Sequence, residues 1–317
     1  MTNSSTIHGV YLSETLDLHA IYGDALTSSG DVVLWQPDQV PDPADIRFAV
    51  CWAPGQAAFA PYPNLSLAMS IGAGVDALLA HPGIDKDVAI ARVRDPHQAA
   101  LMAGFAVHEV LHYERDFDQM SENAAGALWQ PLPMRAPKSR VVAVLGNGTM
   151  GQAVILALRA LDFTVQVACR TQPAAPLDGV SYLTGADAHR AAAKGADYLI
   201  NVLPLTPVTE DALNTELFSG LNPGARLIQI GRGEHLVEAD LVTALETGQL
   251  AGATLDVFRT EPLPPDHPFW THPNLRITPH IASDSVPEVV AAQVIETARA
   301  LRDGAPLRLA IARAQGY

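Results

Sequence analysis

Short apolar runs and longer stretches of helical periodicity alternate along the chain. In the first hundred residues, apolar runs at 31–35, 47–52 and 65–71 are bounded by turns rich in Pro, Asp and Asn, and residues 13–25 have a helical pattern. We interpret the apolar runs as strands. Because strands and helices alternate, this part of the chain is predicted to form a parallel α/β structure.

The second part of the chain begins with a long predicted helix at 97–112, in which apolar residues recur every three or four positions. A polar connector follows at 127–138. Further helices are predicted at 152–161 and 238–247, and β runs at 140–145, 163–168, 198–203, 226–230, 253–257 and 276–278. This pattern predicts a six-stranded doubly wound sheet over about residues 108–286, and a last helix, 287–302, that returns to the first domain.

The amino-acid composition limits the classes of protein to which this chain can belong. With 48% hydrophobic and 17% charged residues, the 317-residue chain can bury a large core, and its length fits two domains. The net charge of −14 argues against nucleic acids and anionic membranes as binding partners. Cys51 and Cys169 lie far apart without metal-ligand spacing, which excludes a disulfide framework and a Cys-rich zinc site.

Targeting signals are also missing from the sequence pattern. The first residues lack the basic and apolar regions of a secretory signal, and the longest uncharged stretch, 48–75, is interrupted by prolines and glycines. We therefore predict a soluble, cytoplasmic protein, and we predict no metal site.

Residues 146–151 have the spacing of a dinucleotide-binding loop. They read Gly-Asn-Gly-Thr-Met-Gly, directly after a β run and at the start of a predicted helix. The first glycine permits a tight turn, the second lets the backbone approach a pyrophosphate, and the third allows close helix–strand packing. The helix N-terminus then offers N–H groups to the phosphates. The predicted cofactor contacts are Gly146, Gly148, Thr149, Met150 and Gly151.

The end of the next strand indicates which nucleotide binds. NAD sites usually carry Asp or Glu there, about 20 residues after the loop. Here the strand is followed by Arg170 and Thr171, whereas the nearest acid, Asp162, precedes it. A guanidinium can pair with a 2′-phosphate, and the threonine can donate a hydrogen bond. We predict NADPH as the preferred cofactor, with NADH as the alternative if Arg170 is an ordinary loop arginine.

Three later segments place charged side chains at or beyond strand ends, where open α/β sheets bind ligands. Arg232 follows the fourth strand, Glu261 follows the fifth, and His280 ends the last. Taken singly, each has a structural explanation: a solvated loop arginine, a Glu-Pro helix start, or a histidine in the core. Their joint occurrence after a dinucleotide-binding loop favours a catalytic set.

At these residues the sequence resembles the D-isomer-specific 2-hydroxyacid dehydrogenases, and within them the glyoxylate/hydroxypyruvate reductase A group. Nearly the whole chain carries the resemblance, including segments 71–76, 111–118, 201–206, 261–265 and 314–317. It implies two Rossmann-like, doubly wound α/β domains with a cleft between them, the cofactor domain being inserted into the substrate domain. The divisions we predict are 1–107 with 287–317 for a flavodoxin-like substrate domain, and 108–286 for the NAD(P)-binding Rossmann domain.

The resemblance implies that Arg232, Glu261 and His280 catalyse reduction of a 2-oxo acid, and their chemistry agrees. Hydride transfer to the carbonyl carbon builds negative charge on its oxygen. His280 as imidazolium can donate a proton there, because the ordinary pKa of histidine is about 6.5. Glu261 on the other ring nitrogen would orient the ring and favour its charged form, and Arg232 would engage the carboxylate and carbonyl oxygens.

Further binding positions follow from the resemblance. Backbone N–H groups of Ala73 and Gly74 would hold the substrate carboxylate, and Trp52 would close the pocket, with core packing as its alternative. Leu203 and Pro204 would line the adenosine side of the groove.

Around the nicotinamide, Asp256 would lie near the amide, or else cap the next turn. Gly231, which follows Ile230, stands where relatives usually carry alanine before the arginine, and Ser283 stands where they often carry a small apolar residue. Ser283 would hydrogen-bond the nicotinamide amide. These departures leave the substrate preference open.

The predicted function is NADPH-dependent reduction of small 2-oxo acids, glyoxylate and hydroxypyruvate first. One alternative is an NAD(P)-dependent D-2-hydroxyacid dehydrogenase acting on bulkier 2-oxo acids such as phenylpyruvate; a more remote one is a binding protein that senses dinucleotides without turnover. The resemblance also implies a homodimer, formed through the helix and connector at about 97–135, where 129–133 is either an arm or an exposed linker.

Overall fold

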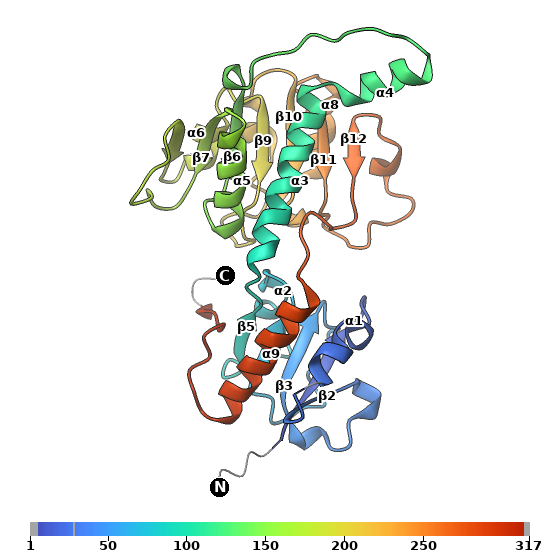
Figure 1. Ribbon diagram of the computed structural model, residues 1–317, viewed down its shortest axis with the longest axis vertical. Coiled ribbons are helices and arrows are strands. Elements are labelled where there is room, and N and C mark those ends of the chain that lie inside the picture. The colour runs from blue at the N-terminus through green and yellow to red at the C-terminus, as the bar shows by residue number, and fades with distance from the viewer. Residues whose placement is uncertain (1–5, 28, 314–317) are drawn as a thin grey trace. The chain divides into compact units, whose positions relative to one another are not determined.

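The computed structural model describes residues 6–27 and 29–313, which form two compact units (Figure 1). Unit 1 consists of residues 1–97 and 284–317, and unit 2 of residues 98–283, so unit 2 is an insertion in the sequence of unit 1. The division predicted at residue 107 falls inside a continuous helix, α3 (Pro96–Glu114). The terminal segment 314–317 lies outside the described residues.

Unit 1 is built on a five-stranded parallel sheet in the order β2-β1-β3-β4-β5. The three apolar runs predicted as strands are β2, β3 and β4, whereas β1 and β5 were not predicted. The strands are β1 (Ile7–Ser13), β2 (Val32–Trp35), β3 (Ile46–Trp52), β4 (Leu67–Ser70) and β5 (Ala89–Arg92), and the helices are α1 (Leu18–Thr27), α2 (Asp76–Leu79) and α9 (Pro287–Arg302).

The first helix begins later than its hydrophobic pattern predicted. Ser13 Oγ accepts hydrogen bonds from the N–H groups of residues 15 and 16, and Asp17 Oδ1 accepts one from the N–H of Ala20. These side chains satisfy the backbone in a turn, so α1 starts only at Leu18. Its apolar face, with that of α9, packs on one side of the sheet and closes the core of unit 1.

Unit 2 contains a seven-stranded parallel sheet in the order β12-β11-β10-β9-β6-β7-β8. Its strands are β6 (Val141–Leu145), β7 (Thr164–Ala168), β8 (Val180–Leu183), β9 (Tyr198–Asn201), β10 (Ala225–Gln229), β11 (Leu250–Leu255) and β12 (Leu275–Ile277). The prediction of six strands was wrong, because the edge strand β8 is only half-buried and lacks a strongly apolar run.

Helices cover both faces of the unit 2 sheet. One face packs against α3 and α5 (Thr149–Ala160), which lie in front of the sheet in Figure 1. The other packs against α6 (Ala188–Ala193), α7 (Thr215–Ser219) and α8 (Glu238–Glu246), while α4 (Phe117–Ala125) has no buried residue. The α/β class and the two parallel sheets are therefore confirmed. No helix in the described ranges combines the length and apolarity needed to cross a membrane.

Candidate active site

The chain order of the unit 2 strands reverses between β6 and β9. From β6 the sheet grows through β7 and β8 on one side, and through β9 to β12 on the other. Parallel strands end at a common edge, and at such a reversal the loops diverge and leave a crevice beyond the strands. The segments predicted to bind cofactor and to catalyse all follow strands of this sheet.

The glycine loop has the geometry that a dinucleotide needs. Gly146 has φ of 114°, which strongly favours glycine, and a Cβ on Gly151 would lie 2.1 Å from the carbonyl oxygen of Gly146. Gly148 precedes α5 without a side-chain cap, and a Cβ there would meet nothing within 4 Å. The loop therefore leaves open space in front of the N–H groups of a twelve-residue helix, which fits a pyrophosphate.

Other predicted cofactor contacts lie at the ends of neighbouring strands. Arg170 and Thr171 lie two and three residues after the end of β7, and Arg170 is exposed. Leu203 and Pro204 come directly after β9, where the carbonyl of Pro204 accepts a hydrogen bond from Thr209 Oγ1. Each of these positions is thus at the edge of the sheet where the glycine loop lies.

Glu261 and His280 form the hydrogen-bonded pair that was predicted. His280 Nδ1 lies 2.7 Å from Glu261 Oε2, and Glu261 Oε1 accepts from the N–H of Phe258 at 2.9 Å. Burial by itself would raise the pKa of Glu261, but its hydrogen bond to His280, the His280 charge, the Phe258 N–H and the charge of Arg232 together lower it. The carboxylate therefore stays ionised and orients the imidazole through Nδ1.

Asp256 fixes the backbone that carries His280. Its side chain is 1% exposed, and its carboxylate accepts hydrogen bonds from the hydroxyl of Thr278 and from the N–H groups of Ile281 and Ala282. The N–H of His280 donates to the Asp256 carbonyl at 2.8 Å. Of the two roles that the sequence left open for Asp256, these contacts are those of a cap on the turn.

Arg232 is held by buried polar residues that the sequence analysis missed. Its N–H donates to His235 Nδ1 at 3.1 Å, and its carbonyl accepts from Gln229 Nε2 at 2.7 Å. Asn201 Nδ2 lies 2.7 Å from Gln229 Oε1 and 2.8 Å from His235 Nδ1. All three side chains are fully buried. The signal in the sequence is a polar residue at the end of a buried strand, at Asn201 and Gln229.

This network also explains Gly231, which departs from the family's pattern. A Cβ at this position would lie 2.8 Å from Asn201 Nδ2 and 3.0 Å from His235 Nδ1, so alanine would crowd both side chains. Ile230, just before it, is buried in the core of the sheet. The glycine therefore leaves room for the polar network behind Arg232.

Ser283, the other departure, donates its hydroxyl hydrogen to the carbonyl of Gln98 at 2.9 Å. The predicted contact with a nicotinamide amide would therefore have to use the hydroxyl oxygen as an acceptor. That contact stays a prediction.

Three of the predicted substrate contacts, Trp52, Ala73 and Gly74, belong to unit 1. Trp52 ends β3, and its ring lies where a Cβ on Gly72 would approach it to 3.0 Å. The N–H of Gly72 donates to Ser70 Oγ at 3.2 Å. No hydrogen bond within residues 6–27 and 29–313 involves the N–H groups of Ala73 and Gly74. They are thus available to an anionic ligand.

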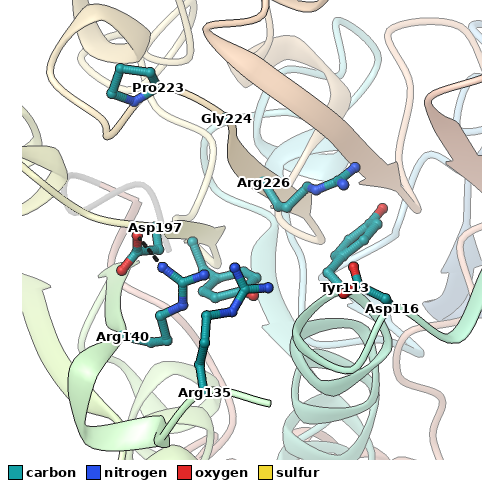
Figure 2. Close-up of a pocket in the computed structure, with 9 residues that line it drawn as sticks. Tyr113, Asp116, Arg135, Arg140, Asp197, Pro223, Gly224 and Arg226 are labelled. Atoms are coloured by element: carbon teal, nitrogen blue, oxygen red, sulfur yellow. Dashed lines mark hydrogen bonds and ion pairs between the residues drawn. The ribbon is translucent and has the colours of Figure 1, made fainter. Parts of the chain in front are cut away.

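A cavity of about 390 Å³ lies elsewhere in unit 2, at the amino ends of its strands (Figure 2). Two of its arginines are paired with carboxylates: Arg135 Nε and Arg140 Nε lie 3.2 and 3.1 Å from the carboxylate of Glu114, and Arg140 Nη1 lies 3.1 Å from Asp197. The third, Arg226, donates to the carbonyl of Ala251 and lies over the ring of Tyr113. None of the residues predicted to bind cofactor or to catalyse lines this cavity. It is lined by Tyr113, Asp116, Arg135, Arg140, Asp197, Tyr198, Pro223, Gly224 and Arg226.

The sequence is similar to a known protein family and to named relatives in it. Residues 107–282 match the model of the D-isomer specific 2-hydroxyacid dehydrogenase, NAD binding domain. A glyoxylate/hydroxypyruvate reductase A of Serratia proteamaculans is 42% identical over 275 residues, which cover 85% of this chain and 86% of that protein. A protein of the same name from Yersinia enterocolitica is 40% identical over 267 residues, or 83% and 84% of the two chains.

Solved structures extend the similarity to almost the whole chain. A D-isomer specific 2-hydroxyacid dehydrogenase from Xanthobacter autotrophicus, in complex with NADPH and MES, has a TM-score of 0.87 at 34% identity, covering 98% of this chain and 99% of that one. An NADPH-dependent glyoxylate/hydroxypyruvate reductase from Sinorhizobium meliloti, in complex with NADP and sulfate, has a TM-score of 0.88 at 29% identity, with the same coverage. The chain therefore belongs to the D-isomer specific 2-hydroxyacid dehydrogenase family.

Proposed function

We propose that this protein is an NADPH-dependent reductase of small 2-oxo acids, converting glyoxylate to glycolate and hydroxypyruvate to D-glycerate. The observation that carries this function is the 2.7 Å contact between His280 Nδ1 and Glu261 Oε2, close enough to Arg232 for its charge to lower the pKa of Glu261. The pair stands in a dinucleotide-binding unit, and the relatives named glyoxylate/hydroxypyruvate reductase support the substrate class.

Each side chain has a separate task in the reaction. The reduced nicotinamide, when bound, supplies the hydride. Arg232 holds the carboxylate and carbonyl oxygens of the 2-oxo acid and stabilises the negative charge that develops on the carbonyl oxygen. His280 Nε2 donates a proton to that oxygen, and Glu261 favours the imidazolium form before the transfer. In this proposal unit 2 is the cofactor domain and unit 1 the substrate domain.

Direct assay tests the activity. Purified protein with NADPH and glyoxylate, hydroxypyruvate, pyruvate or phenylpyruvate is followed by the absorbance of NADPH. We expect the highest kcat/KM for glyoxylate or hydroxypyruvate. A higher value for phenylpyruvate would favour the dehydrogenase of bulkier acids instead. Absence of turnover on all four, together with tight NADPH binding, would favour the dinucleotide-sensing protein.

NADPH preference rests on Arg170 and on the nucleotides in the related structures. We expect Arg170→Ala to lower the ratio of kcat/KM for NADPH to that for NADH by at least tenfold, because a charged hydrogen bond to the 2′-phosphate is worth about 1.5–3 kcal/mol. An unchanged ratio would show that another residue recognises the phosphate. Cytoplasmic location stays a prediction from the sequence.

A further inference from the structure

Arg92 is the last residue of β5 and reaches the turn that follows β4. Its Nη1 donates to the carbonyl of Ala73 at 2.8 Å. Its Nε is buried and finds no hydrogen-bond partner among the described residues. The guanidinium is therefore only partly satisfied by the protein, although it is half-buried beside the turn.

The charge of Arg92 is also uncompensated. In the described part of the chain no carboxylate is ion-paired with it, in contrast to Arg299 and Arg302, which share Asp31. Burial and the neighbouring Arg94 lower the pKa of Arg92. A half-buried cation without a counter-ion is costly for a fold, and an anionic ligand beside it would recover part of that cost.

The contact with Ala73 has a consequence for the next N–H group. The carbonyl of Ala73 and the N–H of Gly74 belong to one planar peptide, in which they point in opposite directions. A cation on the carbonyl oxygen polarises this peptide and makes its N–H a stronger donor. The N–H of Gly74 has no partner within the described residues, while Ser70 Oγ and Ser285 Oγ hold the preceding part of the turn at Gly72 and Ile71.

We propose that Arg92 positions and polarises the Ala73–Gly74 peptide to receive the substrate carboxylate, and supplies a positive charge beside this turn. This inference rests on the proposed function, since it assumes that a 2-oxo acid binds at the turn. Arg92 is a positioning residue here. It discriminates substrates that carry a carboxylate from other carbonyl compounds, and it takes no part in hydride or proton transfer.

The test compares Arg92→Gln with Arg94→Gln as a matched control. Both variants remove one positive charge within two residues of each other, but Arg94 is exposed and only its backbone is held, by Gln293. With glyoxylate we expect Arg92→Gln to lower kcat/KM by roughly tenfold to hundredfold, mainly through KM, and to weaken inhibition by oxalate by the same factor. KM for NADPH stays unchanged, and Arg94→Gln stays within twofold of the parent.

Two further measurements separate positioning from loss of structure. Arg92→Lys keeps the charge and should recover part of the affinity for oxalate, and thermal unfolding shows whether each variant is folded. Equal effects of Arg92→Gln and Arg94→Gln on oxalate inhibition would overturn the inference, as would a fall in kcat with KM unchanged.

The anion site beside Arg92 can be tested even if the proposed function is wrong. If the parent protein reduces no 2-oxo acid, oxalate is tested instead by its stabilisation of the protein against heat. Stabilisation that is lost in Arg92→Gln and kept in Arg94→Gln would support the anion site without the reductase. No stabilisation of the parent by oxalate would refute the site itself.

Discussion

His280 has a backbone conformation that histidine seldom adopts, with φ of 54°. The left-handed region costs an L-residue roughly 1–2 kcal/mol, so the surrounding structure must enforce it. Asp256 does so: its carbonyl accepts the N–H of His280, and its carboxylate accepts the next two N–H groups. The position of the imidazole is thus set by a buried acid that is outside the catalytic set.

We expect His280→Ala to lower kcat by roughly 10²–10⁴-fold, the usual contribution of a placed general acid. Binding of NADPH should stay unchanged, because the glycine loop is separate from this side chain. Stopped-flow measurement of a single turnover checks the chemical step, and fluorescence titration with NADPH serves as the control. A loss smaller than tenfold would mean that the proton comes from another group.

Glu261→Gln is expected to change the pH profile as well as the rate. Folding lowers the pKa of Glu261 below its ordinary value of 4.5, so the carboxylate stays charged throughout the working range and is protonated only in more acidic solution. Glutamine has no carboxylate to protonate and cannot supply the negative charge beside His280. The acid fall of kcat/KM that protonation of Glu261 causes in the parent should therefore be absent from the variant, on a lower plateau, in a pH–rate profile. An acid fall that Glu261→Gln leaves in place would contradict this role.

At the scale of elements, apolar runs predicted buried strands such as β6 and β9, but they missed the half-exposed β8 and also β1 and β5. The glycine loop follows β6, and Arg232, Glu261 and His280 were predicted as a catalytic set because each comes after a later strand of the same sheet. The network of Asn201, Gln229 and His235 was missed, because its hydrogen bonds join residues 28 and 34 positions apart, and a polar residue at the end of a strand does not identify its partner. Topology brings these side chains together.

Two glycines of one loop should respond differently to alanine. At Gly148 a Cβ enters open space in front of α5, so the fold is unaffected but the approach of a pyrophosphate is blocked. At Gly151 it meets the Gly146 carbonyl at 2.1 Å, so the fold itself is strained. We expect Gly148→Ala to weaken NADPH binding at least tenfold without a change in Tm, and Gly151→Ala to lower Tm by several degrees. Isothermal titration and thermal unfolding measure the two effects; equal Tm values for both variants would contradict the assignment.

At the scale of the whole molecule, the connector between α4 and β6 exposes unusual apolar area. Leu128, Trp129 and Met134 are 53%, 97% and 73% exposed, and in Figure 1 this segment is an extended loop that follows α4. Large apolar side chains gathered on one surface segment are typical of protein interfaces. This agrees with the homodimer that the family resemblance implies.

We expect the protein to sediment as a dimer at micromolar concentration, and Trp129→Ser to raise the dimer dissociation constant at least tenfold. An aromatic side chain that is almost fully exposed in the single chain gains burial only from a partner, and anchors of this kind contribute at least 2 kcal/mol to binding. Val208→Ser is the matched control, because Val208 is 85% exposed but lies outside the connector. Analytical ultracentrifugation across a concentration series measures all three proteins. A monomeric parent protein would contradict the predicted dimer. A dimer weakened equally by both substitutions would place the interface elsewhere on the surface.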